Sequence, residues 1–118
     1  MAVEGIFYVE LFVPDLARSK RFYGDTLGWK LGTDEAGVAG FHFGAGYLVV
    51  LADNRPEHER RFAGGMLVEV KVDDLDAQHT RLAKADVKVS AIEAKPWGER
   101  NFSFADPDGY VWRYGQSG

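Results

Sequence analysis

Hydrophobic and polar residues alternate in two short stretches of the chain that resemble each other. Residues 9–16 read V-E-L-F-V-P-D-L, and residues 68–75, half a chain length further on, read V-E-V-K-V-D-D-L. Because a strand turns successive side chains to opposite faces, Val9, Leu11 and Val13 share one face of the first stretch. The Asp-Leu pair that ends each stretch opens a helical pattern. The repeat therefore predicts two similar modules, each starting with a strand and a helix.

The second face of each predicted strand carries a glutamate at the same place. The first strand is expected over residues 6–13 and the second over residues 66–72. Their second faces carry Tyr8, Glu10 and Phe12 in the first module, and Leu67, Glu69 and Lys71 in the second. The two glutamates are candidate functional residues, because charge-assisted hydrogen bonds to a ligand are the stronger kind.

Each predicted helix has a clear start and end. Asp15 is placed to cap the first helix, and Asp73 or Asp74 the second, because an aspartate side chain accepts hydrogen bonds from the first turn. Gly28 and Asp86 follow the two helices, at a position where a left-handed backbone is common. The two modules therefore continue in the same way.

Two hairpins complete the modules. They comprise residues 41–43 with 47–51 and residues 101–104 with 110–114. An extended segment precedes each hairpin, starting at Trp29 in the first module and covering residues 87–92 in the second. Residues 115–118 are expected to form a frayed tail.

The hairpins can be aligned with each other. The alignment sets Val50 opposite Arg113 and His42 opposite Ser103. From this alignment we expect Val50, Val111 and Arg113 to lie on the same surface as the second faces of the first strands. This surface is expected to line a cavity.

The sequence thus predicts an α+β fold. In this fold, two βαβββ modules form a cupped, partly closed mixed sheet with the helices outside. We expect a single domain over residues 1–118. Its modules span about residues 5–52 and 66–115, and a polar connection covers residues 53–65.

Composition narrows the classes of function. The chain has no cysteine, which excludes disulfides, thiolate zinc sites and a cysteine nucleophile. Its net charge of -4 argues against a nucleic-acid partner. No apolar run approaches the ~20 residues of a membrane span, and the N-terminus lacks the pattern of a signal peptide. We therefore expect a cytoplasmic protein without a membrane partner.

Three segments resemble the glyoxalase/bleomycin-resistance/extradiol-dioxygenase group, the vicinal oxygen chelate superfamily. They are residues 9–29, residues 68–75, and residues 96–109, which read P-W-G-E-R-N-F-S-F-A-D-P-D-G. The resemblance implies paired βαβββ modules, a cupped sheet around the functional site, and usually a dimer. A homodimer is also expected because a chain of this length has little left to close the mouth of a cup.

The resemblance also implies where metal ligands would stand. In this sequence those positions are Tyr8, Leu67, about Val50, and Arg113. Leu67, Val50 and Arg113 cannot bind a cation, so no metal ion or other cofactor is expected. This departure argues against the lyase, isomerase and ring-cleaving dioxygenase activities of the family, which depend on a metal.

The expected ligand-binding residues are Tyr8, Glu10, Phe12, Glu69, Lys71, Trp97 and Arg113. Three alternatives stay open for the carboxylates. They form ion pairs with Arg113 or Lys71, they are solvated on the wall of a wide cup, or they meet the donors or positive charge of a ligand. Trp97 lies in a P-W-G stretch that resembles the proteins sequestering bleomycin-type antibiotics. It either packs on the rim of the sheet or stacks against a planar ligand.

These observations predict metal-independent binding of a small planar molecule, neutral or cationic, in an aromatic cleft, as in antibiotic resistance. No catalytic residue is predicted. The alternative is a metal-dependent lyase, isomerase or dioxygenase-like enzyme in which Glu10, Glu69 and His42 hold a divalent ion. A third reading is a sensing or structural module. His79, at helical spacing from Leu75, is expected to be a partly buried helix residue.

Overall fold

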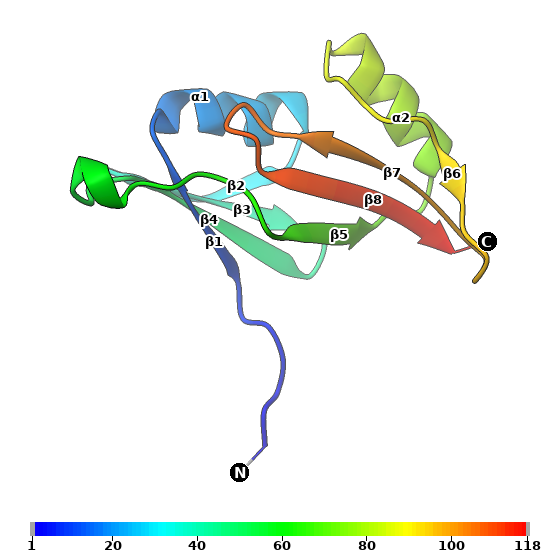
Figure 1. The fold of residues 1–118 in the computed structure, drawn as a ribbon, viewed down its shortest axis with the longest axis horizontal. Coiled ribbons are helices and arrows are strands. Elements are labelled where there is room, and N and C mark those ends of the chain that lie inside the picture. Colours follow the sequence, from blue (N-terminus) through cyan, green and yellow to red (C-terminus); the bar gives the residue numbers. More distant parts are fainter. Residues whose placement is uncertain (1, 118) are drawn as a thin grey trace. The chain divides into compact units, whose positions relative to one another are not determined.

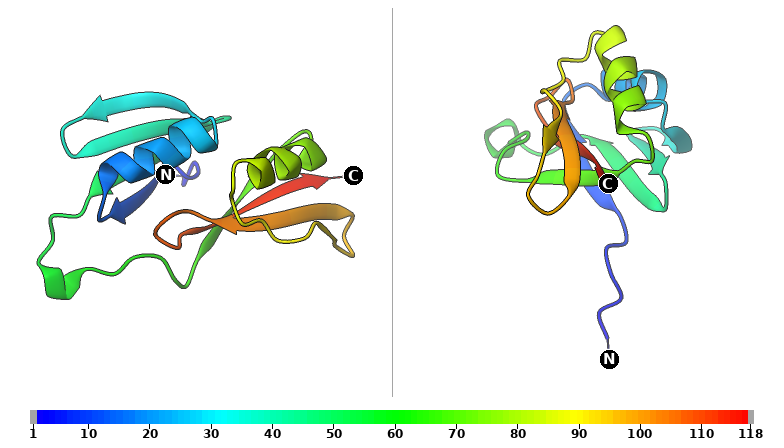
Figure 2. Two further views of the ribbon diagram at one scale, coloured as in Figure 1. Left: turned by 90° about the horizontal axis from the view of Figure 1, so that it is seen from above. Right: turned by 90° about the vertical axis from the view of Figure 1, so that its right-hand side faces the viewer.

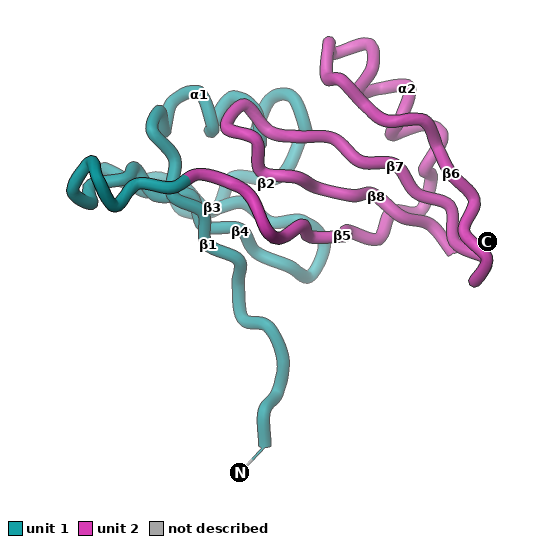
Figure 3. The backbone as a smooth tube through the Cα atoms, viewed as in Figure 1, with its two compact units in different colours: residues 1–61 teal, residues 62–118 magenta. Residues whose placement is uncertain are grey.

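The computed structural model describes residues 2–117. The chain divides into two compact units, and the boundary lies between Arg61 and Phe62 (Figure 3). We call them unit 1 and unit 2 and describe each by itself. Each unit is a βαβββ module, which confirms the predicted α+β class and the paired modules. The assignment of both units to a single domain stays a prediction.

Unit 1 is a four-stranded sheet with one helical segment (Figure 1). Its strand order is β1-β4-β3-β2, in which β1 runs parallel to β4 and the other neighbours are antiparallel. The elements are β1 (Val9–Val13), α1 (Leu16–Lys20), η1 (Arg21–Thr26), β2 (Lys30–Glu35), β3 (Val38–Phe43) and β4 (Gly46–Ala52), followed by the short turn η2 (Glu57–Glu59).

The helical segment of unit 1 starts as the sequence predicts and then widens. The Asp15 carboxylate accepts a hydrogen bond from the backbone N–H of Arg18 at 3.1 Å. After α1 the backbone changes to π-helical spacing in η1, where the N–H of Leu27 donates to the carbonyl of Phe22 at 2.8 Å. Gly28 then turns the chain with φ 75°, as expected for a glycine after a helix.

Unit 2 repeats this topology with the strand order β5-β8-β7-β6. Its elements are β5 (Leu67–Lys71), α2 (Leu75–Lys84), β6 (Glu93–Ala94), β7 (Glu99–Ala105) and β8 (Val111–Ser117). Of the two possible caps of α2, it is Asp74 that accepts from the N–H of Ala77, at 3.0 Å. Asp86 adopts φ 64° after the helix, which confirms its predicted left-handed conformation.

In both units the helix lies across one face of the sheet (Figure 2). The core forms on this face. In unit 1, Leu11, Val13, Leu48 and Val50 pack with Tyr23, and in unit 2, Leu75 and Leu82 pack with Phe102, Trp112 and Tyr114. We call the other face of each sheet its helix-distal face. No helix among residues 2–117 has the length and apolar character needed to cross a membrane.

Three predicted boundaries are wrong. The first strand begins at Val9 because the preceding Ile6 and Phe7, 88% and 90% exposed, pair with no strand of the described chain. Residues 115–117 are not a tail, since Gly115 pairs with Asn101 inside β8; residue 118 lies outside the described residues. Residues 87–92 hold only an isolated bridge, and the strand forms at β6 instead.

The predicted facing of Val50 is also wrong. Parallel pairing sets Glu10 beside Val49 and Glu69 beside Arg113, so the counterpart of Arg113 is Val49. Val50 is fully buried on the helix side. The two hairpins differ in turn length, with a tight turn at 44–45 and a longer one at 106–110, and a shift of one residue moves a side chain to the other face.

Candidate functional site

A polar cluster lies on the helix-distal face of unit 2, across three neighbouring strands. Glu69 on β5 pairs with Arg113 on β8, and Asn101 on β7 pairs with Gly115 on β8. Glu99, two residues before Asn101 on β7, shares its face because side chains alternate along a strand. We call Glu69, Glu99, Asn101, Arg113 and Gly115 the carboxylate cluster.

The two glutamates of the cluster are hydrogen-bonded to each other. They come from β5 and β7, and they meet above the intervening strand β8 at Gly115. A Cβ atom at Gly115 would lie 2.6 Å from Glu99 Oε1 and 2.7 Å from Glu69 Oε2. The carboxyl groups therefore occupy the space that a side chain at residue 115 would need.

This hydrogen bond shifts the two pKa values in opposite directions. The bond to Glu99, burial and the nearby charge of Glu99 raise the pKa of Glu69 above its ordinary value. The same bond, together with hydrogen bonds from Trp97 and Asn101, lowers the pKa of Glu99 to about 2. The two shifts have opposite sign because two carboxylates in contact repel each other, so the proton of the pair is held more tightly by Glu69 than by Glu99.

Trp97 lies beside the cluster. Its indole Nε1–H donates to Glu99 Oε2 at 2.9 Å, and the side-chain amide of Asn101 donates to Glu99 Oε1 at 3.1 Å. Gly98, with φ 92°, allows the turn in which its N–H donates to the carbonyl of Lys95 at 3.0 Å. Although its N–H is tied to Glu99, the side chain of Trp97 remains 70% exposed and can receive a planar partner.

The cationic side chains of this face, Arg113 and Lys71, form at most one weak ion pair within the described residues. Arg113 Nη1 lies 3.7 Å from Glu69 Oε1, and both side chains are about one-third exposed. An exposed ion pair of this kind contributes ~0–1 kcal/mol to stability. Lys71 pairs with Gly115 along the strands and makes no ion pair with another residue in the range 2–117.

The other predicted residues belong to unit 1. Glu10 and Phe12 lie on the helix-distal face of β1, and the guanidinium of Arg55 lies 4.1 Å from the centre of the Phe12 ring. Arg55 is held by two hydrogen bonds from its guanidinium to the Asp53 carboxylate, at 2.9 and 2.7 Å. Tyr8 precedes β1 and is partly exposed. The structure thus brings Glu10 and Phe12 onto one face of unit 1.

His42 also faces away from the helix of unit 1. It pairs with Tyr47, and the two rings meet edge to face with centroids 4.8 Å apart. The hydroxyl of Tyr47 accepts from the backbone N–H of Thr33 at 2.9 Å. His79 lies on α2 and its Nε2 is 2.9 Å from the carbonyl of Ser90, as expected for a partly buried helix residue.

Sequence reasoning missed Glu99 and Asn101. A signal was present, because residues 99–105 read E-R-N-F-S-F-A and set polar side chains at alternate positions opposite Phe102 and Phe104. The predicted hairpin begins at residue 101, so the alternation was not extended to Glu99.

The side chains at the family's metal positions do not fit a divalent ion. With the corrected register these positions are Tyr8, Leu67, Val49 and Arg113. Leu67 and Val49 have no donor atom, and Arg113 is a cation. Over residues 2–117, no group of three or more His, Cys, Asp or Glu side chains is arranged to hold a metal ion.

The chain matches the Glyoxalase/Bleomycin resistance protein/Dioxygenase superfamily over residues 5–114. Among solved structures it is similar to TnmS3, an antibiotic binding protein from Streptomyces sp. CB03234, with 29% identity, a TM-score of 0.81, and 100% of this chain and 99% of that chain covered. It is also similar to TioX from Micromonospora sp. ML1, with 25% identity, a TM-score of 0.79, and 96% and 98% covered.

Lactoylglutathione lyase from Agrobacterium tumefaciens shares the fold, with 22% identity, a TM-score of 0.77, and 98% of this chain and 96% of that chain covered. A comparison with curated proteins found no match. The family match covers nearly the whole sequence and agrees with the two βαβββ modules. The chain belongs to the Glyoxalase/Bleomycin resistance protein/Dioxygenase superfamily.

Proposed function

We propose that the protein binds a small planar cation at the carboxylate cluster and Trp97, without a metal and without changing the ligand chemically. The observation that carries the proposal is the hydrogen-bonded pair of Glu69 and Glu99 next to an exposed indole. The similarity to TnmS3, whose name describes antibiotic binding, supports a role in sequestering a toxic molecule.

Trp97 and the carboxylates would make different contributions to binding. Stacking on an aromatic face contributes about 0.5–1.5 kcal/mol beyond the burial of apolar area. A hydrogen bond to a charged carboxylate contributes roughly 1.5–3 kcal/mol. The bond from Trp97 to Glu99 fixes the indole beside the charge, so that one ligand can contact both.

The shared proton makes this site sensitive to ligand charge. A cation that hydrogen-bonds both carboxylates takes the place of the proton between Glu69 and Glu99. Binding is then accompanied by release of that proton below the raised pKa of Glu69. A neutral planar molecule would stack on Trp97 without displacing the proton, and it would bind more weakly.

The proposal also includes further ligand contacts, the location of the protein and its oligomeric state. Tyr8, Glu10 and Phe12 are proposed ligand contacts of unit 1, and Lys71 and Arg113 are proposed contacts of unit 2. We also propose a cytoplasmic homodimer. Light scattering at micromolar concentration tests the dimer, and a monomer would contradict it.

The binding function can be tested with proflavine, a planar aromatic cation, on protein treated with a chelator. We expect saturable binding of one molecule per site and recovery of proflavine unchanged. Trp97→Ala should weaken binding about tenfold or more, since stacking and burial are both lost. Met66→Ala is the matched control, because Met66 is as exposed as Trp97 but lies outside the cluster.

Metal content separates this proposal from the enzyme alternative. A stoichiometric, tightly bound divalent ion in protein purified without chelator would favour the alternative. Equal affinity of Trp97→Ala and the unaltered protein would contradict stacking. Loss of proflavine binding in chelator-treated protein would contradict metal independence.

A further inference from the structure

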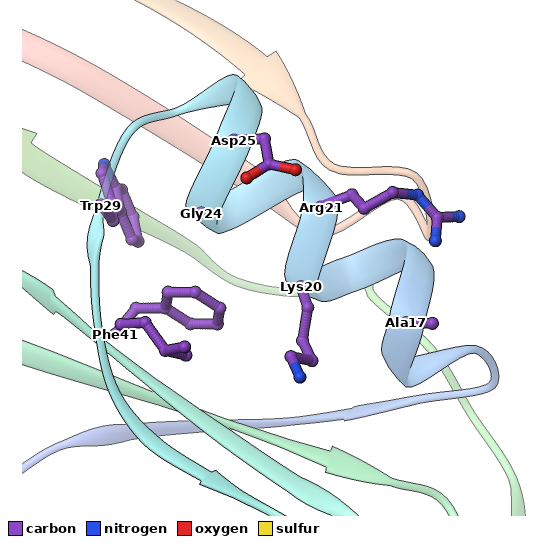
Figure 4. A pocket seen from close by; sticks show the side chains of 8 residues that line it. Ala17, Lys20, Arg21, Gly24, Asp25, Trp29 and Phe41 are labelled. Carbon is purple, nitrogen blue, oxygen red and sulfur yellow. The ribbon is translucent and has the colours of Figure 1, made fainter.

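Unit 1 contains a pocket of about 500 Å³ on the helix side of its sheet. It lies between the helical segment and strands β2 and β3, and so it is separate from the carboxylate cluster in unit 2 (Figure 4). Its lining residues are Ala17, Lys20, Arg21, Gly24, Asp25, Trp29, Leu31 and Phe41. Small-molecule sites in proteins typically measure ~300–1,000 Å³, so this pocket has the size of a ligand site.

The π-helical turn η1 shapes one end of the pocket. After η1 the N–H of Trp29 donates to the carbonyl of Tyr23 at 3.0 Å, which holds Trp29 where the chain leaves the helix. The Trp29 ring also packs on Phe43, with centroids 4.9 Å apart. Isolated π-helical turns occur often at functional sites. The turn thus places a firmly packed indole at the pocket wall.

Gly24 keeps the pocket open. Its backbone does not adopt the left-handed conformation, and a Cβ at this position would meet only Phe41, at an ordinary 3.4 Å. Neither backbone strain nor close packing therefore requires a glycine. A glycine inside a helical segment costs about 0.5–1 kcal/mol relative to alanine. Glycine is thus present at Gly24 although it destabilises the helical backbone, and its missing side chain leaves room above Phe41.

The remaining lining gives the pocket an apolar floor and a cationic rim. Trp29, Leu31 and Phe41 supply the floor, and Leu31 is 42% exposed although it is a large apolar residue. In Figure 4 the Lys20 side chain extends from the helix towards the side on which Phe41 lies. The Lys20 ammonium contacts Asp34 at 2.6 Å, in a pair that is exposed enough to exchange partners.

We propose that this pocket is a second binding site, for a small planar aromatic carboxylate. The aromatic ring lies against Trp29, Leu31 and Phe41. The carboxylate replaces Asp34 as the partner of Lys20. Asp25 is the one anion of the lining and disfavours a second negative charge. The preferred charge is opposite to that of the ligand proposed for unit 2, so the two sites can be tested separately.

The probe is 2-naphthoate, observed by NMR at the amide of Gly24 and the indole N–H of Trp29. We expect saturable shifts at both groups and no comparable shifts at the indole of Trp97. The matched cation 2-naphthylmethylammonium should bind this pocket at least about tenfold more weakly, because its charge would lie beside the Lys20 ammonium.

Two variants test the pocket independently. Gly24→Leu fills the space above Phe41 and should weaken 2-naphthoate binding at least about tenfold, whereas Gly24→Ala should bind within about threefold of the unaltered protein. Lys20→Met keeps the aliphatic stem and should also weaken binding about tenfold. Lys30→Met is its control, because Lys30 pairs with His42 on the helix-distal face.

Several results would overturn the proposal. These are the absence of shifts at Gly24 and Trp29 at millimolar 2-naphthoate, equal binding by Gly24→Leu, or equal binding of the naphthyl cation. Circular dichroism and the melting temperature show whether Gly24→Leu is folded. If Gly24→Leu does not fold, the affinities of Lys20→Met and Lys30→Met for 2-naphthoate are compared. Equal affinities would overturn the proposal.

Discussion

The carboxyl groups of Glu69 and Glu99 are hydrogen-bonded to each other, and they reach this contact from strands on either side of Gly115. The contact depends on the glycine, since a Cβ there would lie within 2.7 Å of both carboxyl groups. It also depends on Trp97 and Asn101, which donate to the oxygens of Glu99.

Stability should therefore depend on pH through Glu69. Its pKa is raised above the ordinary 4.5, so its contribution to stability is present below that value and is lost as pH rises through its folded pKa. Glu99 acts in the opposite sense, and its contribution is lost as pH falls from 4.5 towards about 2. We expect the melting temperature to rise on acidification from pH 7, and then to fall as pH approaches 2.

Glu69→Gln should abolish the rise in melting temperature on acidification from pH 7. The side-chain amide of the introduced glutamine donates a hydrogen bond to Glu99 at every pH, as the protonated carboxyl group of Glu69 does. The melting temperature of this variant should stay nearly constant between pH 7 and 4.5, measured by calorimetry. A rise equal to that of the unaltered protein would show that another group is responsible.

Gly115→Ala should be destabilising because the carboxyl groups occupy the place of its methyl group. Overpacking of this kind costs about 1–3 kcal/mol in the free energy of unfolding, which chemical denaturation measures. The double variant Gly115→Ala, Glu69→Ala removes one of the two clashing groups and should recover part of the loss. No recovery would mean that the cost has another source.

Trp97→Phe should distinguish the contribution of the aromatic ring at residue 97 from that of its hydrogen bond to Glu99. The variant keeps an aromatic surface but loses the Nε1–H that helps to lower the pKa of Glu99. We expect that pKa to rise from about 2 towards the ordinary value, as followed by carbon NMR of the carboxyl group. Its affinity for proflavine should lie between those of the unaltered protein and Trp97→Ala. An unchanged pKa would contradict the role of the indole donor.

Gly24→Ala should stabilise unit 1. Alanine favours helical backbone over glycine by about 0.5–1 kcal/mol, and the added methyl group meets only Phe41 at 3.4 Å. Chemical denaturation should show an increase of this size in the free energy of unfolding. A loss of stability would mean that the helical turn requires glycine for a packing reason.

Local patterns predicted the modules well because each pattern has a direct physical cause. Alternation set Leu11 and Val13 in the core and Glu10 on the other face, and the aspartates capped the helices as expected. The register between paired strands was harder to predict from the sequence. Val50 was misplaced by one residue because the turns of the two hairpins differ in length, which a sequence alignment of the hairpins does not resolve.

Sequence patterns pointed to some members of the candidate site and not to others. Glu69, Arg113 and Trp97 were singled out because a repeated glutamate, a charged strand residue and a family-like loop are visible in sequence. The structure brings them close together, and their role in binding stays a prediction. Their partner Glu99 was missed because its role depends on two glutamates converging over a glycine of a third strand. The pocket beneath η1 was also missed, since π-helical spacing has no simple sequence signature.

The most direct test of the proposed function is the pH dependence of proflavine binding, measured by calorimetry between pH 4.5 and 7.5. The account predicts that affinity rises with pH until Glu69 is fully ionised, with proton release at the lower pH values, and that Glu69→Gln removes both effects and weakens binding. Binding that is independent of pH, or that Glu69→Gln leaves unchanged, would contradict the proposed role of the carboxylate pair.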